Sequence, residues 1–352
     1  MRSIIRRAAV VAAVLAVPAV PRLAVAQDKA TLSGSEVAIY NLVGSIKAVG
    51  GGSGDVVVSI AKSGKDASQL RVEQGSIRGM QTLRVIYPSR RITFGEGNSW
   101  GGRTTLRVAD DGTFDNKDDE GSRVEISSRS GGLEARADLT VTVPAGKDIQ
   151  LHLAAGDVNV RNVNGDVSVS VAAADVTTTG TKGVLTLDTG SGEVNITDAQ
   201  GDVSLDCGSG SVSLSRIRGE RLSVDAGSGR MRGDDINTKR IDLDLGSGGA
   251  TLKNVTTTDL KLDSGSGSTD LDLASDIDRL DIDSGSGAVT LWVPAALGAK
   301  VDIDAGSGGI DLGIPVSVTR YESDHVVGTI GDGQGTIRID AGSGGVHLRK
   351  RG

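Results

Sequence analysis

Short apolar and polar alternations recur along the second half of the chain and predict a stack of β-strands. Leu185 and Leu187 alternate with polar residues, and Val194 and Ile196 do the same a few residues later. Alternation with period two is typical of strands that bury one face. The same apolar pairs return about every 19 residues. A unit of this length cannot bury its apolar face alone, so the repeat predicts coils that stack on one another.

A Gly-Ser-Gly tripeptide marks one corner of each predicted coil. Its eight copies follow one another at intervals of 18 to 21 residues, apart from a last interval of 36, and begin at Gly190, Gly208, Gly227, Gly246, Gly265, Gly285, Gly306 and Gly342. We expect glycine there because a sharp corner needs backbone angles that other residues avoid. The residue before each tripeptide is nearly always small, which indicates a crowded inner corner. Cys207 occupies that position and is predicted to be a buried, unreactive thiol.

These patterns predict an all-β protein whose main domain is a single-stranded β-helix, or β-solenoid, with about 18–21 residues per coil. The predicted organisation is a signal peptide over residues 1–26, an irregular N-terminal β region with polar loops over 27–145, and the solenoid over 146–352. Atypical ends are expected, because an open coil edge would pair with other chains.

The first 26 residues have the pattern of an export signal. Arg2, Arg6 and Arg7 precede the short apolar run Ala8–Val20, and small residues surround a cleavage site after Ala26. Removal of this segment would leave 34 basic against 45 acidic residues, a net charge of −11. That excess of acidic residues disfavours a nucleic-acid partner. The sequence has no second long apolar run, so we expect no transmembrane segment after removal of the signal. We therefore expect the mature protein in the periplasm, at the cell surface or outside the cell.

An aspartate stands two positions before every tripeptide, and stacked coils would place these carboxylates in one column. We expect each of them to accept hydrogen bonds from its own corner, because aspartate is a common turn residue. The structural corner residues on this interpretation include Asp188, Gly190, Gly192, Asp206, Gly208, Gly210, Asp225, Gly227, Gly229, Asp263, Gly265 and Gly267. The alternative is a row of calcium ions, since Ca²⁺ favours oxygen ligands. Its ligands would include Asp244, Asp263, Asp283 and Asp304.

Catalytic chemistry has little support in the sequence. The histidines at 152, 325 and 347 form no metal-ligand pair by spacing, and no nucleophile elbow or phosphate-binding loop is present. We expect no catalytic residue and no cofactor. An enzyme acting on polysaccharides is a weaker alternative, because it needs paired acids and aromatic subsites. Only Trp100 and Trp292 could serve as such aromatics, and Trp292 is predicted to face outward from its strand.

Two stretches and the glycine-rich units after them resemble a known family. "IYNLVGSIKAVGG" at 39–51 and "LTVTVPAGKDIQLHLAAGDVNVRNVNGDVSV" at 139–169 resemble bacterial exported β-strand-repeat proteins of the DUF4097 type, which carry the label of adhesins. The resemblance implies a β-solenoid without established catalytic residues. It favours a non-enzymatic protein that binds a cell-surface protein or glycan through its repeat faces. The alternative is self-association into a structural filament of the envelope.

Overall fold

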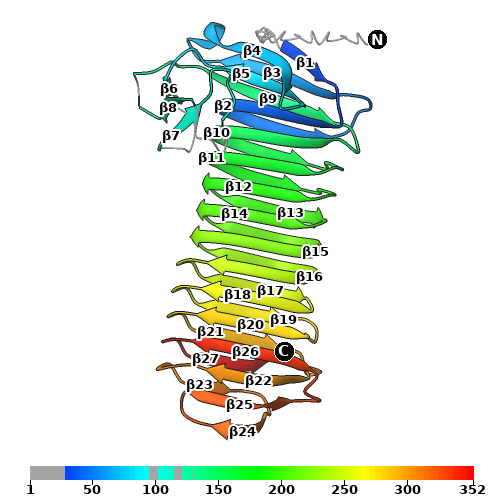
Figure 1. Cartoon of the computed structure of the whole chain (residues 1–352), viewed down its shortest axis with the longest axis vertical. Helices are drawn as coiled ribbons and strands as arrows, with labels where there is room; N and C mark the ends of the chain where they lie inside the picture. Colours follow the sequence, from blue (N-terminus) through cyan, green and yellow to red (C-terminus); the bar gives the residue numbers. More distant parts are fainter. Residues whose placement is uncertain (1–27, 95–101, 115–120, 130) are drawn as a thin grey trace, which may run out of the picture.

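A stack of β-coils makes up most of the molecule, with a small lobe beside its N-terminal end (Figure 1). The structure is a computed structural model and describes residues 28–94, 102–114, 121–129 and 131–352. The predicted signal peptide and Trp100 lie outside the described residues. The predicted all-β class and solenoid architecture are confirmed.

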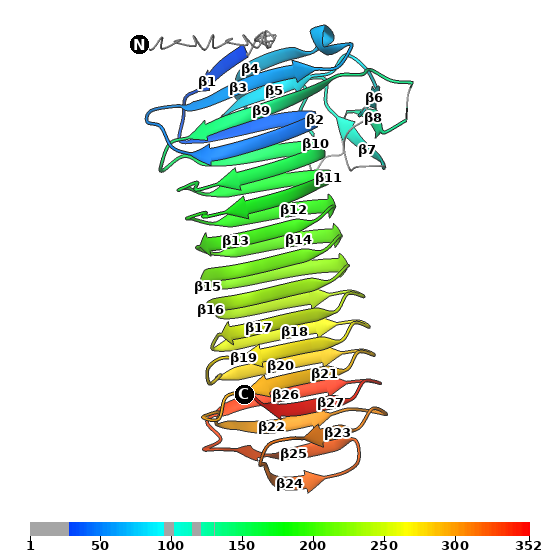
Figure 2. The ribbon, with the colours of Figure 1, turned by 180° about the vertical axis from the view of Figure 1, so that it is seen from behind.

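Two parallel sheets run along the stack, and the chain passes from one to the other in every coil (Figures 1 and 2). Leu185 pairs with Val203 and Val194 with Val212, so neighbouring coils are in register 18 residues apart. The strands that form these coils are β10 (Asp148–Arg161), β11 (Val167–Thr179), β12 (Leu185–Ser191), β13 (Val194–Gln200), β14 (Val203–Ser209), β15 (Val212–Ser228), β16 (Met231–Leu245), β17 (Ala250–Thr256), β18 (Asp259–Ser264), β19 (Thr269–Leu273), β20 (Arg279–Ser284) and β21 (Val289–Val293).

The outer surfaces of the two sheets are named here face A and face B. Face A belongs to the sheet that contains β12, β14, β18 and β20, together with the second halves of β15 and β16. Face B belongs to the sheet that contains β13, β17, β19 and β21, together with the first halves of β15 and β16. Outward side chains on either face therefore form columns along the stack.

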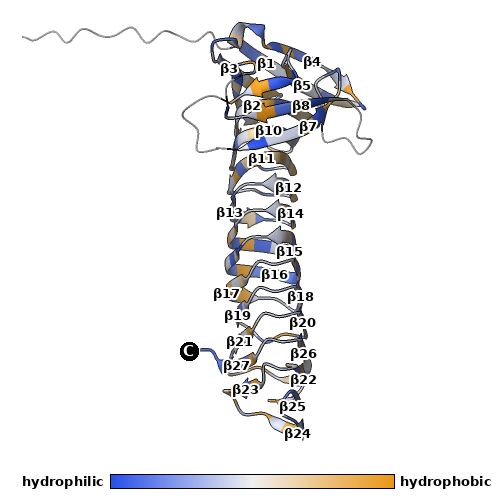
Figure 3. Cartoon of the chain, turned by 90° about the vertical axis from the view of Figure 1, so that its left-hand side faces the viewer, coloured by the Kyte–Doolittle hydropathy of each residue, from blue (hydrophilic) through white to orange (hydrophobic). Residues whose placement is uncertain are grey.

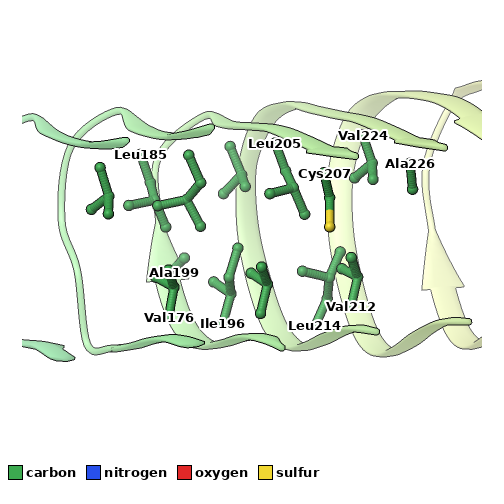
Figure 4. Close-up of a cluster of buried hydrophobic side chains, with 14 of the residues drawn as sticks. Val176, Leu185, Ile196, Ala199, Leu205, Cys207, Val212, Leu214, Val224 and Ala226 are labelled. Carbon is green, nitrogen blue, oxygen red and sulfur yellow. The ribbon is translucent and has the colours of Figure 1, made fainter. Parts of the chain in front are cut away.

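The core is a thin layer of apolar side chains between the two sheets. Leu205 from one sheet and Leu214 from the other are both buried, and Figure 4 shows such residues pointing inward from opposite sides. Cys207 lies among them with 1% of its surface exposed, as predicted. Burial of these ladders is the main source of stability, because each coil covers the apolar row of the next.

Glycine is required at the corners for two reasons. Gly210 has a φ of +143°, a conformation that L side chains rarely adopt, and this agrees with the prediction. Gly208 has ordinary backbone angles, yet a Cβ atom there would lie 2.8 Å from the carbonyl oxygen of Gly190 in the preceding coil. The tight spacing of stacked corners therefore excludes a side chain even where the backbone angles would allow one.

Stacking already begins in the N-terminal region. Val37 pairs with Ile149 and Ile46 with Val158, so β2 forms a coil directly on β10, inside the segment assigned above to 27–145. Two further strands pair with β2 in parallel, and antiparallel strands then continue the sheet beyond them. The elements of this end are β1 (Asp28–Leu32), β2 (Glu36–Gly50), β3 (Val56–Ser63), the 3-10 helix η1 (Ala67–Gln69), β4 (Arg71–Ile77), β5 (Met80–Ile86) and β9 (Arg136–Val143). The lobe is a separate sheet of β6 (Arg91–Thr93), β7 (Arg103–Val108) and β8 (Ser122–Ser127).

The last coils do not follow the order of the sequence. Asp340 pairs with Asp283 on one side and with Asp304 on the other, so β26 is inserted between β20 and β22 (Figure 1). The other side of β22 pairs with β25, and β24 forms the outer edge. The antiparallel hairpin of β24 and β25 thus covers the edge of β22, which would otherwise be open. The elements here are β22 (Ala299–Asp304), β23 (Ile310–Leu312), β24 (Ser317–Tyr321), β25 (His325–Ile330), β26 (Gly335–Ala341) and β27 (Val346–Lys350).

Candidate functional site

A column of eight aspartates follows face A, as the repeat predicts. Each pairs in register with the next across neighbouring strands, in the spatial order Asp188, Asp206, Asp225, Asp244, Asp263, Asp283, Asp340 and Asp304. We call this set the acidic column. Asp263 is half-buried and the other seven are exposed. Parallel strands lie ~4.8 Å apart, so the column is a closely spaced row of negative charge.

Several members of the acidic column lack a counter-charge among the described residues. Lys261 Nζ lies 2.6 Å from Asp263, whereas the described residues give Asp206, Asp225 and Asp244 no ion-pair partner. The nearby arginines neutralise other carboxylates of face A instead: Arg221 binds Asp242 at 2.6 Å, Arg240 binds Asp259 at 3.1 Å, and Arg279 binds Asp281 at 3.1 Å. These ion pairs engage the nearby arginines and leave the column negative.

The predicted hydrogen bonds within each corner are realised at Asp304, whose Oδ1 accepts from the Gly306 N–H at 3.1 Å. Other corners use the same N–H group differently. The Gly246 N–H donates to Ala226 O and the Gly265 N–H to Leu245 O, both at 2.9 Å and both in the preceding coil. These donors therefore continue the ladder between coils. Among the described residues, no three His, Cys, Asp or Glu side chains gather in a way that could hold a metal ion.

A different column of aspartates accepts backbone hydrogen bonds, and it accepts them from the next coil rather than from its own corner. Asp148 Oδ1 accepts from the Asp166 N–H and Asp166 Oδ1 from the Val184 N–H, each at 2.8 Å and each 18 residues along the chain. Asp202 Oδ1 accepts likewise from the Glu220 N–H at 3.0 Å. Asp166 and Asp202 both follow a glycine outside the tripeptides, which is a turn signal that the sequence offered.

Face B carries a groove of about 520 Å³ at the point where β17, β19 and β21 lie side by side. We call it the Trp292 groove; its lining residues are Lys253, Asp270, Asp272, Trp292, Arg351 and Gly352. Trp292 Nε1–H donates to Asp270 Oδ1 at 2.9 Å. Arg351 Nε lies 3.0 Å from Asp272 Oδ1. Trp292 thus faces outward, as predicted, and belongs to a polar cluster.

The groove forms where the repeat loses one residue. Earlier coils carry an extra residue in the left-handed conformation, with φ of +54° at Arg216, +57° at Asp235 and +53° at Asn254. In the next coil Leu252 pairs with Leu271 and Val255 with Leu273, so that extra residue is absent. The local change of register produces a surface that differs from the rest of face B.

The histidines occupy three unlike environments. His152 faces outward but is half-buried, because it stacks on Tyr40 with ring centroids 4.2 Å apart and meets the edge of Phe114. The rings of Tyr40 and Phe114 therefore shield part of this side chain from solvent. His325 Nε2 lies 2.9 Å from Asp302 Oδ1. His347 remains half-exposed near Asp311.

The sequence profile of the Toastrack DUF4097 family matches residues 41–349. The chain belongs to this family. No curated protein matches the sequence. A solved structure described as a "putative cell adhesion protein" from Clostridium sporogenes is similar at 11% identity, over 92% of this chain and 99% of that chain, with a TM-score of 0.18. Within the described residues no helix is long and apolar enough to cross a membrane.

Proposed function

We propose that this DUF4097 protein is exported and binds a partner at a cell surface through the outward faces of its coils, as an adhesin does. The partner is a surface protein or a glycan. We propose binding in place of catalysis because the repeat offers similar side chains at every coil, which suits an extended contact.

The acidic column is the observation that carries this proposal. A row of like charges destabilises the folded state through repulsion. A protein with a purely structural role would have no benefit that offsets this cost. Asp206, Asp225 and Asp244 are nevertheless exposed in register without an ion-pair partner among the described residues. Fixed carboxylates at a regular spacing favour a partner with complementary positive charge and speed its association.

Binding to cells tests the proposal. Labelled protein is titrated onto a panel of bacterial and animal cells, and the same titration is run with the double variant Asp225→Asn and Asp244→Asn. The variant should bind at least about tenfold more weakly, with a smaller dependence on salt, because exposed charges act over a Debye length of ~8 Å in physiological salt.

A matched control keeps the charge change but moves it off the column. Glu193→Gln with Glu322→Gln removes two exposed carboxylates outside the column and outside the Trp292 groove, and it should leave the affinity unchanged. Equal losses in the two double variants would mean that total charge matters and not the column. Absence of binding to every cell type would reject the proposed function.

Self-assembly into filaments is the second candidate, and one observation favours it. Every residue of β24 is exposed, and two large apolar side chains of this edge strand, Val318 and Tyr321, are 42% and 69% exposed. The strand shifts register between Val318 and Arg320, however, and such a bulge hinders pairing with another strand. Sedimentation velocity of the purified protein separates the two functions: filaments favour assembly, and a monomer favours the binding protein.

A further inference from the structure

The indole of Trp292 forms a fixed platform in its groove. The bond from Nε1–H to Asp270 Oδ1 at 2.9 Å sets the orientation of the ring. The neighbouring residues Leu291 and Val293 are buried, which anchors the strand below. The indole also lines the open space of about 520 Å³. A flat apolar surface is thus held beside polar groups in a rigid position.

The charges around this platform balance. The side chains of Lys253 and Arg351 lie opposite those of Asp270 and Asp272, so the side chains that line the groove carry no net charge. Arg351 is occupied, since its side chain contacts Asp272 at 3.0 Å and donates to Asn254 Oδ1 at 2.9 Å. Lys253 is exposed and has no ion-pair partner among the described residues. A ligand with a net charge therefore gains no overall attraction here, and a neutral ligand with many polar groups fits best.

From this chemistry we infer that the Trp292 groove binds a neutral hexose glycan. A pyranose ring has a flat face of C–H groups that can pack on the indole, and a rim of hydroxyl groups that both donate and accept hydrogen bonds. The carboxylates of Asp270 and Asp272 supply acceptors, and the ammonium group of Lys253 supplies donors. This inference rests on the proposed function, because it names a ligand class for surface binding and a second contact point on face B.

The C-terminal strand helps to shape this site. The backbone N–H of Arg351 donates to Val293 O at 2.8 Å, which holds the end of the chain beside β21. Figure 3 shows the end of the chain on the side of the stack where β21 and β27 lie. Because the register change and this segment occur together at one place, the groove accommodates a short stretch of glycan and not a contact repeated in every coil.

Fluorescence of Trp292 provides a direct test. The full chain with Trp100→Phe has Trp292 as its sole tryptophan. We would titrate it with maltohexaose, cellohexaose, mannohexaose, laminarihexaose and chitohexaose, and follow emission together with titration calorimetry. Saturable binding of at least one hexasaccharide, accompanied by a shift of the Trp292 emission, is the expected result.

Three variants assign the binding to the groove. In the wild-type background Trp292→Ala should weaken the affinity at least about tenfold through loss of the stacking surface. Asp270→Ala, which releases the ring, should weaken it about fivefold, a smaller loss because the indole itself remains. Tyr321→Ala removes an aromatic residue that is 69% exposed at the far edge strand and should have no effect. Thermal unfolding and circular dichroism of each variant check that the fold is retained.

The outcomes separate this inference from the proposed function. Cell binding without binding of any of the five hexasaccharides overturns the groove assignment and leaves the proposed function in place. Hexasaccharide binding that is unchanged in a folded Trp292→Ala variant also overturns it. Loss of cell binding in the acidic-column variant, with hexasaccharide binding intact, supports both. A protein that binds neither cells nor hexasaccharides rejects both.

Discussion

Replacement of Asp225 by asparagine should stabilise the protein, because Asp225 lies between Asp206 and Asp244, and none of the three has an ion-pair partner in the described part of the chain. At a strand spacing of ~4.8 Å, each like-charge contact costs about 0.9 kcal/mol with the dielectric constant of water. Two contacts are removed, which gives about 1.7 kcal/mol without salt. A Debye length of ~8 Å at 0.15 M salt reduces this gain to about 1 kcal/mol.

Urea unfolding at several salt concentrations measures this gain. The free energy of unfolding should rise by about 1.5 kcal/mol at 0.01 M salt, and the rise should fall to about 0.3 kcal/mol at 1 M salt, where screening is strong. Variants are compared by midpoint at an unchanged slope. Asp263→Asn is the matched variant: it also loses the bond to Lys261 at 2.6 Å, so its gain should be smaller than that of Asp225→Asn.

A loss of stability in Asp225→Asn at low salt would refute this reasoning. It would mean that the carboxylate accepts hydrogen bonds within its corner or holds a cation, each of which outweighs the repulsion. Treatment with EDTA distinguishes these two cases. We expect the urea midpoint to be unchanged by chelation. A fall that calcium restores would instead assign a metal site to the acidic column.

The remaining predictions concern the core, the corners and export. Leu243→Ala should cost about 2–5 kcal/mol, since this leucine is 2% exposed, whereas Asp242→Asn on the outer side should change little; equal effects in urea unfolding would contradict the alternation. Gly208→Ala should lower the melting temperature, because the added Cβ would lie 2.8 Å from a carbonyl oxygen, and Ser209→Ala in the exposed centre of the same corner should not. Export predicts a mature chain that starts at residue 27; mass spectrometry of protein from its native host would contradict this by finding the chain intact from Met1.

Local patterns in the sequence predicted the coil well. The alternation around Leu185 and Val194 placed the inward ladders, and the small residues before each tripeptide, such as Cys207, are buried as expected. The sequence also placed the aspartates in one column. These features depend on residues within one period, and identical coils stack in register because their apolar rows coincide.

Features that depend on contacts between distant residues were not predictable in the same way. The repeat period does not reveal that the unit of Asp340 lies between the units of Asp283 and Asp304. All three units share the same pattern, so each could stack equally well on either of the others. The Trp292 groove needs a lost residue after Leu252 and the side chain of Arg351 from the end of the chain. The corner N–H groups could donate to several acceptors, and only the structure shows that the Gly246 N–H donates to Ala226 O in the preceding coil.

Carboxylate footprinting of the protein bound to cells tests the proposed binding through the repeat faces most directly. Exposed aspartates are labelled with a carbodiimide and an amine, with and without cells, and the labelled sites are read by mass spectrometry. The account predicts that Asp206, Asp225 and Asp244 are protected in the bound state, while Glu322 near the edge strand β24 is labelled equally in both states. Protection of Glu322 with unchanged labelling of the acidic column would contradict the account and locate the contact at the end of the stack.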